Sequence, residues 1–578
     1  MRRGSATVHY CLAAEGGPLL LPSRYGVPKE RRVRPAGRVA QRSKHVYSIH
    51  MNPESDVGFI VQSFAQPLSH GTRLAFVGRM ATGETFAAVR NRFHPSFFVR
   101  RSELGDAQDA LGSIEFGVLE SWWKTLDGAE VAELRFESLR DASVAAERLA
   151  LRSIRTYEAD VKATDRFLMD QRIHGSCRIV GDHERGRHVD RVYIDPELTA
   201  CDWRPTLGVL ALDIETDPEG SEIRAVSLVR CSLEVGAEQR EIEPNAREVL
   251  IQGVGGEATG TSAEAPQPYL PDYVKVCSDE ADLLRALVSR IVHLDPDIVT
   301  GWNVIEFDFR RIAERLAFHR IEFAVSRSRD PASFLDSRGH QAAGVSIPGR
   351  QVIDAMRLVR YGPERYEDRR LDTVATAVLG VGKTESATDE AKLERLEALY
   401  RDDPAEFCRY CLVDSELVLR ILAKTGLLEL TIMRCLLIGI ALNRAWTSIS
   451  AFEFLYIEGL HADGLVAPTV GVDPLPLDEA PGGAILTPHP GLFRNVFVFD
   501  FKSLYPSIIR TFNIDPATLI RGSVSGIGAE RPQAEAHDAI EAPGGTLFSR
   551  KTGILPRLLD RFFDNRQAAK DRGDGTAS

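Results

Sequence analysis

The sequence predicts a mixed α/β protein with several domains. Its 578 residues exceed the usual length of one domain, and 44% hydrophobic and 26% charged residues are ordinary for a globular protein. From Gly58 onward apolar and polar residues alternate, as in half-exposed strands. From residue 206 onward apolar strands alternate with amphipathic helices, which is typical of α/β layers. No apolar run is long enough to span a bilayer, so we expect no membrane partner.

Residues 1–50 differ from the rest of the chain. They hold ten Lys and Arg against two Glu, which predicts a basic extension without regular structure. Three interpretations are open: an arm that contacts nucleic acid, a disordered tail, or sequence upstream of a true start at Met51. We favour the last two. The eight cysteines are spaced irregularly, so we expect a reducing, cytoplasmic location rather than a disulfide framework.

The remaining elements follow in order along the chain. Residues 51–205 form an amino-terminal, mostly β domain, with one amphipathic helix expected over 141–155. A second domain begins near residue 206 with an apolar strand that ends in DIET. We then expect helices over 279–294 and 307–320, with a buried strand and turn over 297–303 between them. A helical region covers about 390–465, and a Pro-rich break follows it.

Four acids and a tyrosine lie at informative positions in the second domain. Asp213 and Glu215 are two residues apart in a strand, so their side chains point to the same side. Asp308 begins a predicted helix. Tyr410 and Asp414 are four apart on another helix and share a face. Two acids at the end of an apolar strand repel each other unless a cation lies between them, so the group predicts a metal site.

The order DIE, then NxxxFD, then YxxxD resembles the three motifs of the DEDD-type 3′→5′ exonucleases that use tyrosine. The resemblance implies an RNase H-like domain over residues 206–428 and two divalent ions, Mg²⁺ or Mn²⁺, held by the four acids. It also implies that Tyr410 orients the attacking water, and that Asn303 and Phe307 line a groove for single-stranded DNA. Trp302 and the pair Cys408 and Cys411 are interpreted as packing residues.

The run from Phe497 to Pro516 carries a second signature, in which an apolar strand is expected to end at Asp500 and a Ser-Leu-Tyr-Pro turn follows. This run resembles the first metal-binding motif of the family B DNA polymerases, especially their bacterial polymerase II branch. The resemblance implies that Asp500 binds both ions of a nucleotidyl-transfer site. It assigns contacts with an incoming dNTP to four positions: Phe501, Ser503, Leu504 and Tyr505, the last of which would exclude a ribose 2′-hydroxyl.

Further matches extend the same resemblance. Gly482 and Gly483 resemble a glycine motif that approaches the template strand, and Arg566 and Lys570 resemble triphosphate ligands on the first fingers helix. The implied domains are a helical return segment over 429–475, a partial palm over 476–552 and the start of the fingers over 553–578. The implied partners are primer–template DNA, a single-stranded 3′ end and dNTPs, with a sliding clamp for a full-length form.

The departures from the family pattern leave the activity open. Only 68 residues follow Arg510, and they contain no recognisable second catalytic-carboxylate motif and no thumb. The alternatives are a truncated or incompletely sequenced polymerase with proofreading, a stand-alone Mg²⁺-dependent exonuclease, and a non-catalytic remnant. We expect the partial palm to leave exposed apolar surface. A net charge of −11 argues weakly against DNA binding, since local patches matter more than the total.

Overall fold

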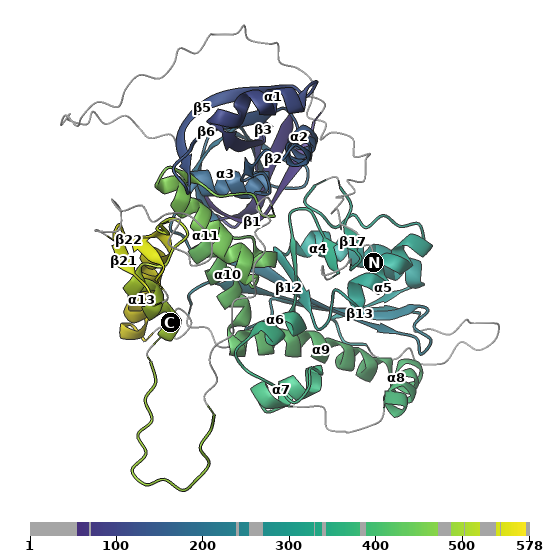
Figure 1. Ribbon diagram of the computed structural model, residues 1–578. Helices are drawn as coiled ribbons and strands as arrows, with labels where there is room; N and C mark the ends of the chain where they lie inside the picture. Colours follow the sequence, from purple (N-terminus) through teal and green to yellow (C-terminus); the bar gives the residue numbers. More distant parts are fainter. Residues whose placement is uncertain are drawn as a thin grey trace, which may run out of the picture.

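The computed structural model describes residues 55–68, 71–237, 242–253, 270–328, 330–337, 343–381, 389–471, 487–501, 503–520, 539–543 and 545–573. The expected basic extension, residues 1–50, and the glycines Gly482 and Gly483 lie outside these ranges. In the described part of the chain, no helix is both long and apolar enough to cross a membrane. Figure 1 shows the amino-terminal sheets at the top, the second domain below them and the carboxyl-terminal helix at one side.

The amino-terminal domain is built on two sheets. The strand order of the first is β11 (Glu197–Ala200), β8 (Ser176–Val180), β1 (Asp56–Pro67), β2 (Thr72–Met80), β3 (Thr85–Phe93), β10 (Arg191–Ile194) and β9 (His183–Arg185). The order of the second is β20 (Leu465–Val466), β5 (Phe116–Thr125), β6 (Glu130–Phe136), β4 (Ser96–Arg100) and β7 (Thr156–Tyr157). Three helices accompany them: α1 (Leu104–Leu111), α2 (Leu139–Leu151) and α3 (Ala163–Gln171). Helix α2 confirms the helix expected over 141–155, and it begins where Ser138 accepts a bond from the N–H of Asp141.

The second domain has one sheet with helices on both faces (Figure 1). The strand order is β15 (Val274–Cys277), β14 (Ala246–Gln252), β13 (Ile223–Glu234), β12 (Thr206–Thr216), β16 (Ile298–Gly301) and β19 (Gln351–Asp354). The strands β12, β16 and β19 are parallel, whereas β13 runs antiparallel to β12 and β14. Helices α4 (Glu280–Leu294) and α5 (Asp308–Phe318) cover one face, and α7 (Leu371–Leu379) and α9 (Pro404–Thr425) cover the other.

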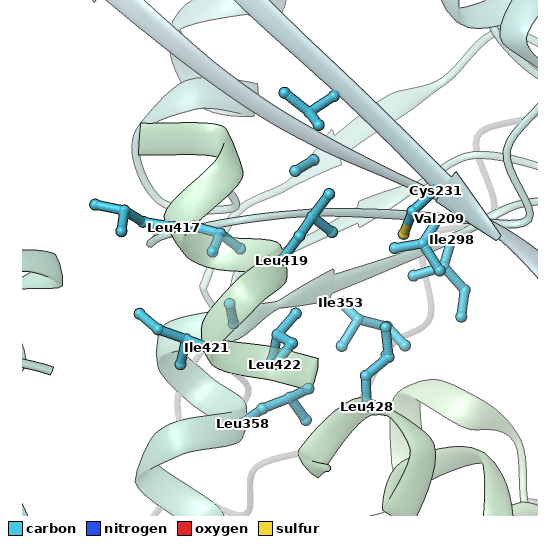
Figure 2. Close-up of a cluster of buried hydrophobic side chains, with 14 of the residues drawn as sticks. Val209, Cys231, Ile298, Ile353, Leu358, Leu417, Leu419, Ile421, Leu422 and Leu428 are labelled. Atoms are coloured by element: carbon cyan, nitrogen blue, oxygen red, sulfur yellow. The ribbon is translucent and has the colours of Figure 1, made fainter. Parts of the chain in front are cut away.

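Strand β12 is apolar on both faces because it is the buried centre of this sandwich. Its odd-numbered residues, such as Val209, belong to the core under α9, whereas even-numbered residues such as Leu212 pack with α4 and α5. Figure 2 shows the first of these cores, with Val209 and Ile298 facing Leu419 and Leu422 of α9. Alternation along a strand therefore sends residues 213 and 215 to the α9 side.

Smaller elements complete this domain, and the chain then returns to the amino-terminal sheets. The smaller elements are β17 (Ser333–Leu335), β18 (Gly344–Ser346), α6 (Ala355–Tyr361) and α8 (Asp389–Asp402). After α9 come α10 (Leu427–Ile438) and α11 (Ser448–Ala462), and β20 then pairs in parallel with β5. Residues of α11, such as Phe454 and Leu455, belong to the core under β1 and β2. The segment therefore ties the second domain to the first.

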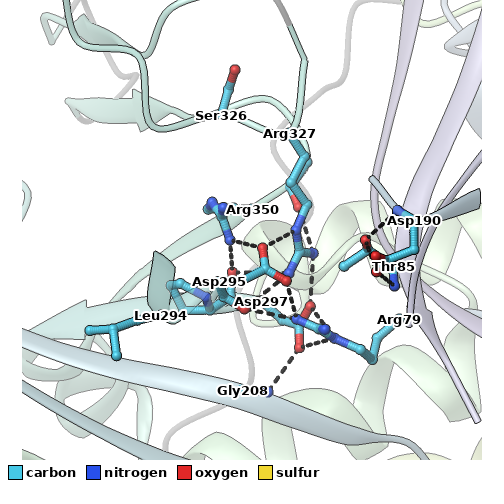
Figure 3. Close-up of polar contacts among 12 residues, drawn as sticks. Arg79, Thr85, Asp190, Gly208, Leu294, Asp295, Asp297, Ser326, Arg327 and Arg350 are labelled. Atoms are coloured by element: carbon cyan, nitrogen blue, oxygen red, sulfur yellow. Dashed lines mark hydrogen bonds and ion pairs between the residues drawn. The ribbon is translucent and has the colours of Figure 1, made fainter. Parts of the chain in front are cut away.

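A buried ionic network joins the two domains (Figure 3). Arg79 of β2 contacts Asp297 at 3.0 Å and Asp295 at 3.0 Å, in the loop between α4 and β16. Arg327 contacts Asp297 at 2.8 Å, and neither of these side chains is exposed to solvent. Arg350 contacts Asp295 at 2.7 Å. Burial by itself raises the pKa of the Asp295 carboxyl, but Arg327 and Arg350 outweigh it and hold the pKa well below its ordinary value.

A second polar cluster fixes α11 to α3. The imidazole of His461 is 3.0 Å from the carboxylate of Glu158 and 3.2 Å from that of Asp170. Arg166 contacts the same Glu158 at 2.7 Å. Burial alone lowers the pKa of His461, but its bonds to Asp170 and Glu158 outweigh burial and raise the pKa above the ordinary value. The protonated imidazole is therefore the form that this cluster stabilises.

The carboxyl-terminal elements are α12 (Leu504–Phe512), the hairpin β21 (Ala539–Glu541) and β22 (Leu547–Ser549), and α13 (Ile554–Asp571). Asn513 and Asp515 connect them. The Asn513 side chain donates to the carbonyl of Lys551 at 2.8 Å and accepts from the N–H of Gly553 at 2.8 Å. The Asp515 carboxylate accepts from the hydroxyl of Tyr456 in α11 and from the N–H of Leu555, both at 2.6 Å.

The strand expected before Asp500 is not formed, and that prediction was wrong. Residues 487–501 include no strand, and Phe497, Val498 and Phe499 expose 81%, 90% and 90% of their surface. A strand needs a neighbour for its backbone N–H and C=O groups, and no other strand pairs with this segment in the described part of the chain. The exposed apolar surface expected for a partial palm is therefore present.

Candidate active site

Three carboxylates meet at the end of β12. The oxygens of Asp213, Glu215 and Asp414 lie within 4.8 Å of one another. Asp213 and Glu215 project toward α9 because they continue the odd-numbered face of β12, and Asp414 lies on α9. Asp414 keeps only 8% of its surface exposed. Such a close group of negative charges is stable when a cation lies among them.

A buried pair of hydroxyls sets the position of α9 against the sheet. Ser227 of β13 is the direct neighbour of Asp213 across the β12–β13 ladder. Its hydroxyl lies 2.6 Å from that of Ser415, the residue after Asp414, and neither serine is exposed. Because the two hydroxyls satisfy each other away from water, a slip of α9 along the sheet would leave both without this bond. Ser415 therefore holds Asp414 in register with Asp213.

The fourth expected acid, Asp308, is close to this group but is not a member of it. It is the first residue of α5, on the opposite face of the sheet, and it is 1% exposed. Its carboxylate accepts a 3.0 Å bond from the backbone N–H of Ile214, between Asp213 and Glu215. Burial raises the pKa of Asp308 well above its ordinary value, the Ile214 bond opposes the rise, and the charges on Asp354 and Glu215 add to it.

The other expected exonuclease residues surround the acids. Tyr410 is half-buried on α9, one turn before Asp414. Asn303 has a positive φ of 60° in the turn after β16, and its carbonyl accepts the N–H of Phe307 at 3.1 Å. Phe307 is 48% exposed. Its ring lines a cavity of about 290 Å³ that Glu215 also lines, so an aromatic surface and a carboxylate face the same space.

The far wall of this cavity comes from residues that the sequence did not single out. Tyr400 of α8 and Phe407 of α9 line it together with Arg224 of β13. The Arg224 guanidinium lies 4.9 Å from the ring centre of Tyr400, and the Tyr400 hydroxyl donates to the carbonyl of Gln252 at 2.6 Å. Phe407 could have been identified from the sequence, because it lies one helical turn before Tyr410 and so shares its face of the helix.

Asp354 is a second residue that sequence reasoning missed. It ends β19, is 2% exposed and accepts from the N–H of Arg357 at 3.1 Å, so it caps α6. Burial raises its pKa, while bonds from the backbone N–H groups of Arg357 and Ile305 oppose the rise. The contact with Ile305 reaches the turn that carries Asn303 and Phe307. An acid directly after the apolar pair Val352 and Ile353 was the sequence signal here.

The donor set fits a hard divalent cation. Carboxylate oxygens are the ligands that Mg²⁺ and Mn²⁺ prefer, and three of them converge here. The thiol of Cys411 lies close by, but burial raises its pKa well above its ordinary value, and the charges of Glu215 and Asp213 add to that rise. Cys408 and Cys411 both belong to the core under α9, as the sequence interpretation expected. Trp302 also packs against that core.

The residues expected in a polymerase site do not form a closed site in the described structure. Asp500 and Phe501 lie in the exposed segment, and Ser503, with φ of 55°, precedes α12. Leu504 and Tyr505 open that helix, and 78% of Tyr505 is exposed. Arg566 and Lys570 are both exposed on α13, one turn apart.

The chain is similar to family B DNA polymerases in sequence and in fold. Residues 154–373 match the model for the exonuclease domain of DNA polymerase family B, and residues 450–573 match the model for DNA polymerase family B. DNA polymerase II of Escherichia coli is 30% identical over 433 residues, which cover 74% of this chain and 50% of that protein. DNA polymerase 2 of Aeropyrum pernix is 26% identical over 85% of this chain and 59% of that protein.

A solved structure agrees with these matches. The family B DNA polymerase of Pyrobaculum calidifontis superposes with a TM-score of 0.65 at 20% identity, over 89% of this chain and 64% of that one. This likeness supports the fold: an exonuclease domain followed by part of a polymerase domain. The chain thus spans about half to three-fifths of the length of the curated relatives named here.

Proposed function

Because the chain belongs to the family B DNA polymerases, we propose that residues 206–428 form a 3′→5′ exonuclease acting on single-stranded DNA. The observation that carries the proposal is the convergence of Asp213, Glu215 and Asp414, with Glu215 lining the same cavity as Phe307. A cleft that combines metal-ligating oxygens with an aromatic platform suits the 3′ end of a flexible strand. The limits of this domain, residues 206 and 428, are also proposed.

The proposed reaction is hydrolysis of the last phosphodiester bond. Divalent cations held by Asp213, Glu215 and Asp414 would supply charge stabilisation for the attacking and leaving oxygens. Water adds to phosphorus, the 3′ oxygen of the preceding nucleotide leaves with a proton, and a nucleoside 5′-monophosphate is released. Phe307 stacks on the terminal base, and the Tyr410 hydroxyl orients the water. Asp308, the fourth acid expected from the sequence, would add a ligand for these cations, and its 3.0 Å bond from the N–H of Ile214 places it beside the two β12 acids.

The test is trimming of a 5′-labelled single strand by the 578-residue protein with Mg²⁺. Asp213→Ala combined with Glu215→Ala should abolish trimming, a loss of at least about 10²–10⁴-fold, since metal loss should cost no less than loss of an acid–base group. Glu219→Ala is the matched control, because Glu219 is an exposed acid four residues after Glu215 and lies outside the carboxylate group. It should leave trimming unchanged.

A second readout separates metal binding from activity. Mn²⁺ should raise the unfolding temperature of the parent protein and of Glu219→Ala, because a ligand that binds only the folded state stabilises it. The double variant should not respond. Trimming by the double variant at the parent rate would disprove the assignment of this site.

We further propose that the full-length form expected from the sequence is a template-directed DNA polymerase with proofreading. Asp500, Tyr505, Arg566 and Lys570 lie in residues 450–573, the range similar to DNA polymerase family B, which supports the roles expected from the sequence. Its substrates would be primer–template DNA and dNTPs, and a sliding clamp would be a partner. The narrower alternative is that this polypeptide acts only as the exonuclease, and an inactive chain in the trimming assay would favour a non-catalytic remnant.

A further inference from the structure

A second cavity, lined by apolar and basic side chains, lies where α3, α11 and α13 meet. It has a volume of about 270 Å³, and three arginines line it: Arg172 at the end of α3, and Arg557 and Arg561 of α13. Glu458 of α11 is the acid among the lining residues. Nothing in the expected exonuclease or polymerase chemistry uses this cavity.

The walls of the cavity are rigidly placed. Gly459 lets α11 and α13 come into close contact, because a Cβ at that position would lie 2.4 Å from a methyl carbon of Ile554. One turn away, the Asp515 carboxylate accepts from the hydroxyl of Tyr456 in α11 and from the N–H of Leu555 in α13, which joins the same two helices. The three arginines therefore line a gap whose width depends on the packing of α11 against α13 rather than on flexible loops.

Two of the three arginines have N–H groups that a ligand could contact. Glu458 is bound to His174 at 2.7 Å, and Arg557 is bound to Asp463 at 2.8 Å. Arg172 and Arg561 are exposed, and neither forms an ion pair with a carboxylate among the described residues. Two guanidinium groups with five N–H donors each therefore flank the cavity.

We propose that this cavity binds phosphate groups in the backbone of single-stranded DNA. A guanidinium fork matches two phosphate oxygens, and two forks facing one cavity suit consecutive phosphates of a strand. With a volume of about 270 Å³, the cavity can hold a phosphate group but not a DNA duplex. The choice of DNA over a free anion follows from the family of the chain, whose substrates are nucleic acids in the proposed function.

This site is separate from the expected nucleotide contacts on the same helix. At about 100° per residue, position 566 lies about half a turn around α13 from position 557, and position 570 lies about half a turn from position 561. Arg566 and Lys570 therefore face away from the cavity. Binding there holds a strand at the junction of the domains without occupying the triphosphate site.

The test measures anisotropy of a fluorescein-labelled oligothymidylate over a series of KCl concentrations, with an Asp213→Ala background and EDTA to prevent degradation. Failure of the exonuclease proposal would not affect this measurement. Arg172→Ala combined with Arg561→Ala should weaken binding about tenfold at low salt. It should also reduce the slope of log K against log salt by about 1.4, which is about 0.7 for each lost phosphate contact on a single strand.

The matched control is Arg140→Ala combined with Arg152→Ala, which removes two exposed arginines at the ends of α2 and the same net charge. It should leave both the affinity and the slope unchanged. Equal losses in the two double variants, or no loss in either, would overturn the proposal. An unfolding temperature that inorganic phosphate raises only when the cavity arginines are present, with DNA affinity unchanged, would assign the cavity to free phosphate and would also overturn it.

Discussion

Replacing Asp297 by asparagine tests whether the buried ionic network holds the two domains together. The Asp297 carboxylate accepts from Arg327 at 2.8 Å, Arg79 at 3.0 Å and the N–H of Gly208 at 2.8 Å. Asparagine keeps the shape and one acceptor oxygen but removes the charge. The Arg327 side chain, which has no solvent exposure, would then lose half of its compensating charge. We expect a loss of about 3–5 kcal/mol, as for other broken buried pairs.

The assay is urea unfolding followed by both far-ultraviolet circular dichroism and tryptophan fluorescence. The tryptophans report on both domains, since Trp123 lies in β5 and Trp302 follows β16. Coincident transitions would indicate that the domains still unfold together, whereas separate transitions would place the damage at the interface.

The control for this prediction is an exposed ion pair. Arg101 and Glu120 contact each other at 2.7 Å, with side chains 45% and 87% exposed. Glu120→Gln should change the stability by only about 0–1 kcal/mol, because solvent screens the pair. If Asp297→Asn were also within about 1 kcal/mol of the parent, the energetic role given to the network would be wrong.

Three further predictions concern single side chains. Tyr410→Phe should reduce trimming less than Asp308→Ala. The first removes one bond that orients water, and such groups contribute about 10²–10⁴-fold to the rate, whereas the second removes an expected metal ligand. The reverse order in the same assay would contradict the assigned roles. The stabilising effect of protonated His461 should be complete below its ordinary pKa of 6.5 and should decline as the pH rises through its raised folded value, so the difference in unfolding temperature between the parent and His461→Gln should shrink with rising pH. In an Asp213→Ala background the 578-residue polypeptide should not extend a primer, and extension that disappears on Asp500→Ala would show that a second catalytic carboxylate is present.

Much of the second domain could be predicted from local pattern. The helices expected over 279–294 and 307–320 are α4 (Glu280–Leu294) and α5 (Asp308–Phe318), and the strand expected over 297–303 is β16 (Ile298–Gly301). Both helices have an amphipathic period that consecutive residues specify, and α4 also has a side-chain cap. Asp279, for example, accepts from the N–H of Asp282 where α4 begins.

What local pattern could not predict depends on distant partners. Residues 497–499 are as apolar as any strand of the sheet, yet they remain unpaired because strand formation requires a neighbour. The network around Asp297 was equally invisible, since its arginines come from positions 79, 327 and 350. Neither a charge in a loop nor one in a strand reveals which charge will face it.

The position of the acids on β12 depends on contacts that hydrophobicity alone does not specify. Because residues 207–212 are buried on both faces, a slip of one residue would still bury apolar side chains on both sides, but it would turn the acids toward α4 and α5. Two hydrogen bonds oppose that slip. Ser227, the ladder neighbour of Asp213, bonds to Ser415 on α9, and the Asp308 carboxylate accepts from the N–H of Ile214 on the other face. A register error would break both bonds and leave buried polar groups unsatisfied, at about 1–3 kcal/mol each. The group of three carboxylates is therefore held in place by hydrogen bonds of neighbouring residues, which offset part of the repulsion among its own charges.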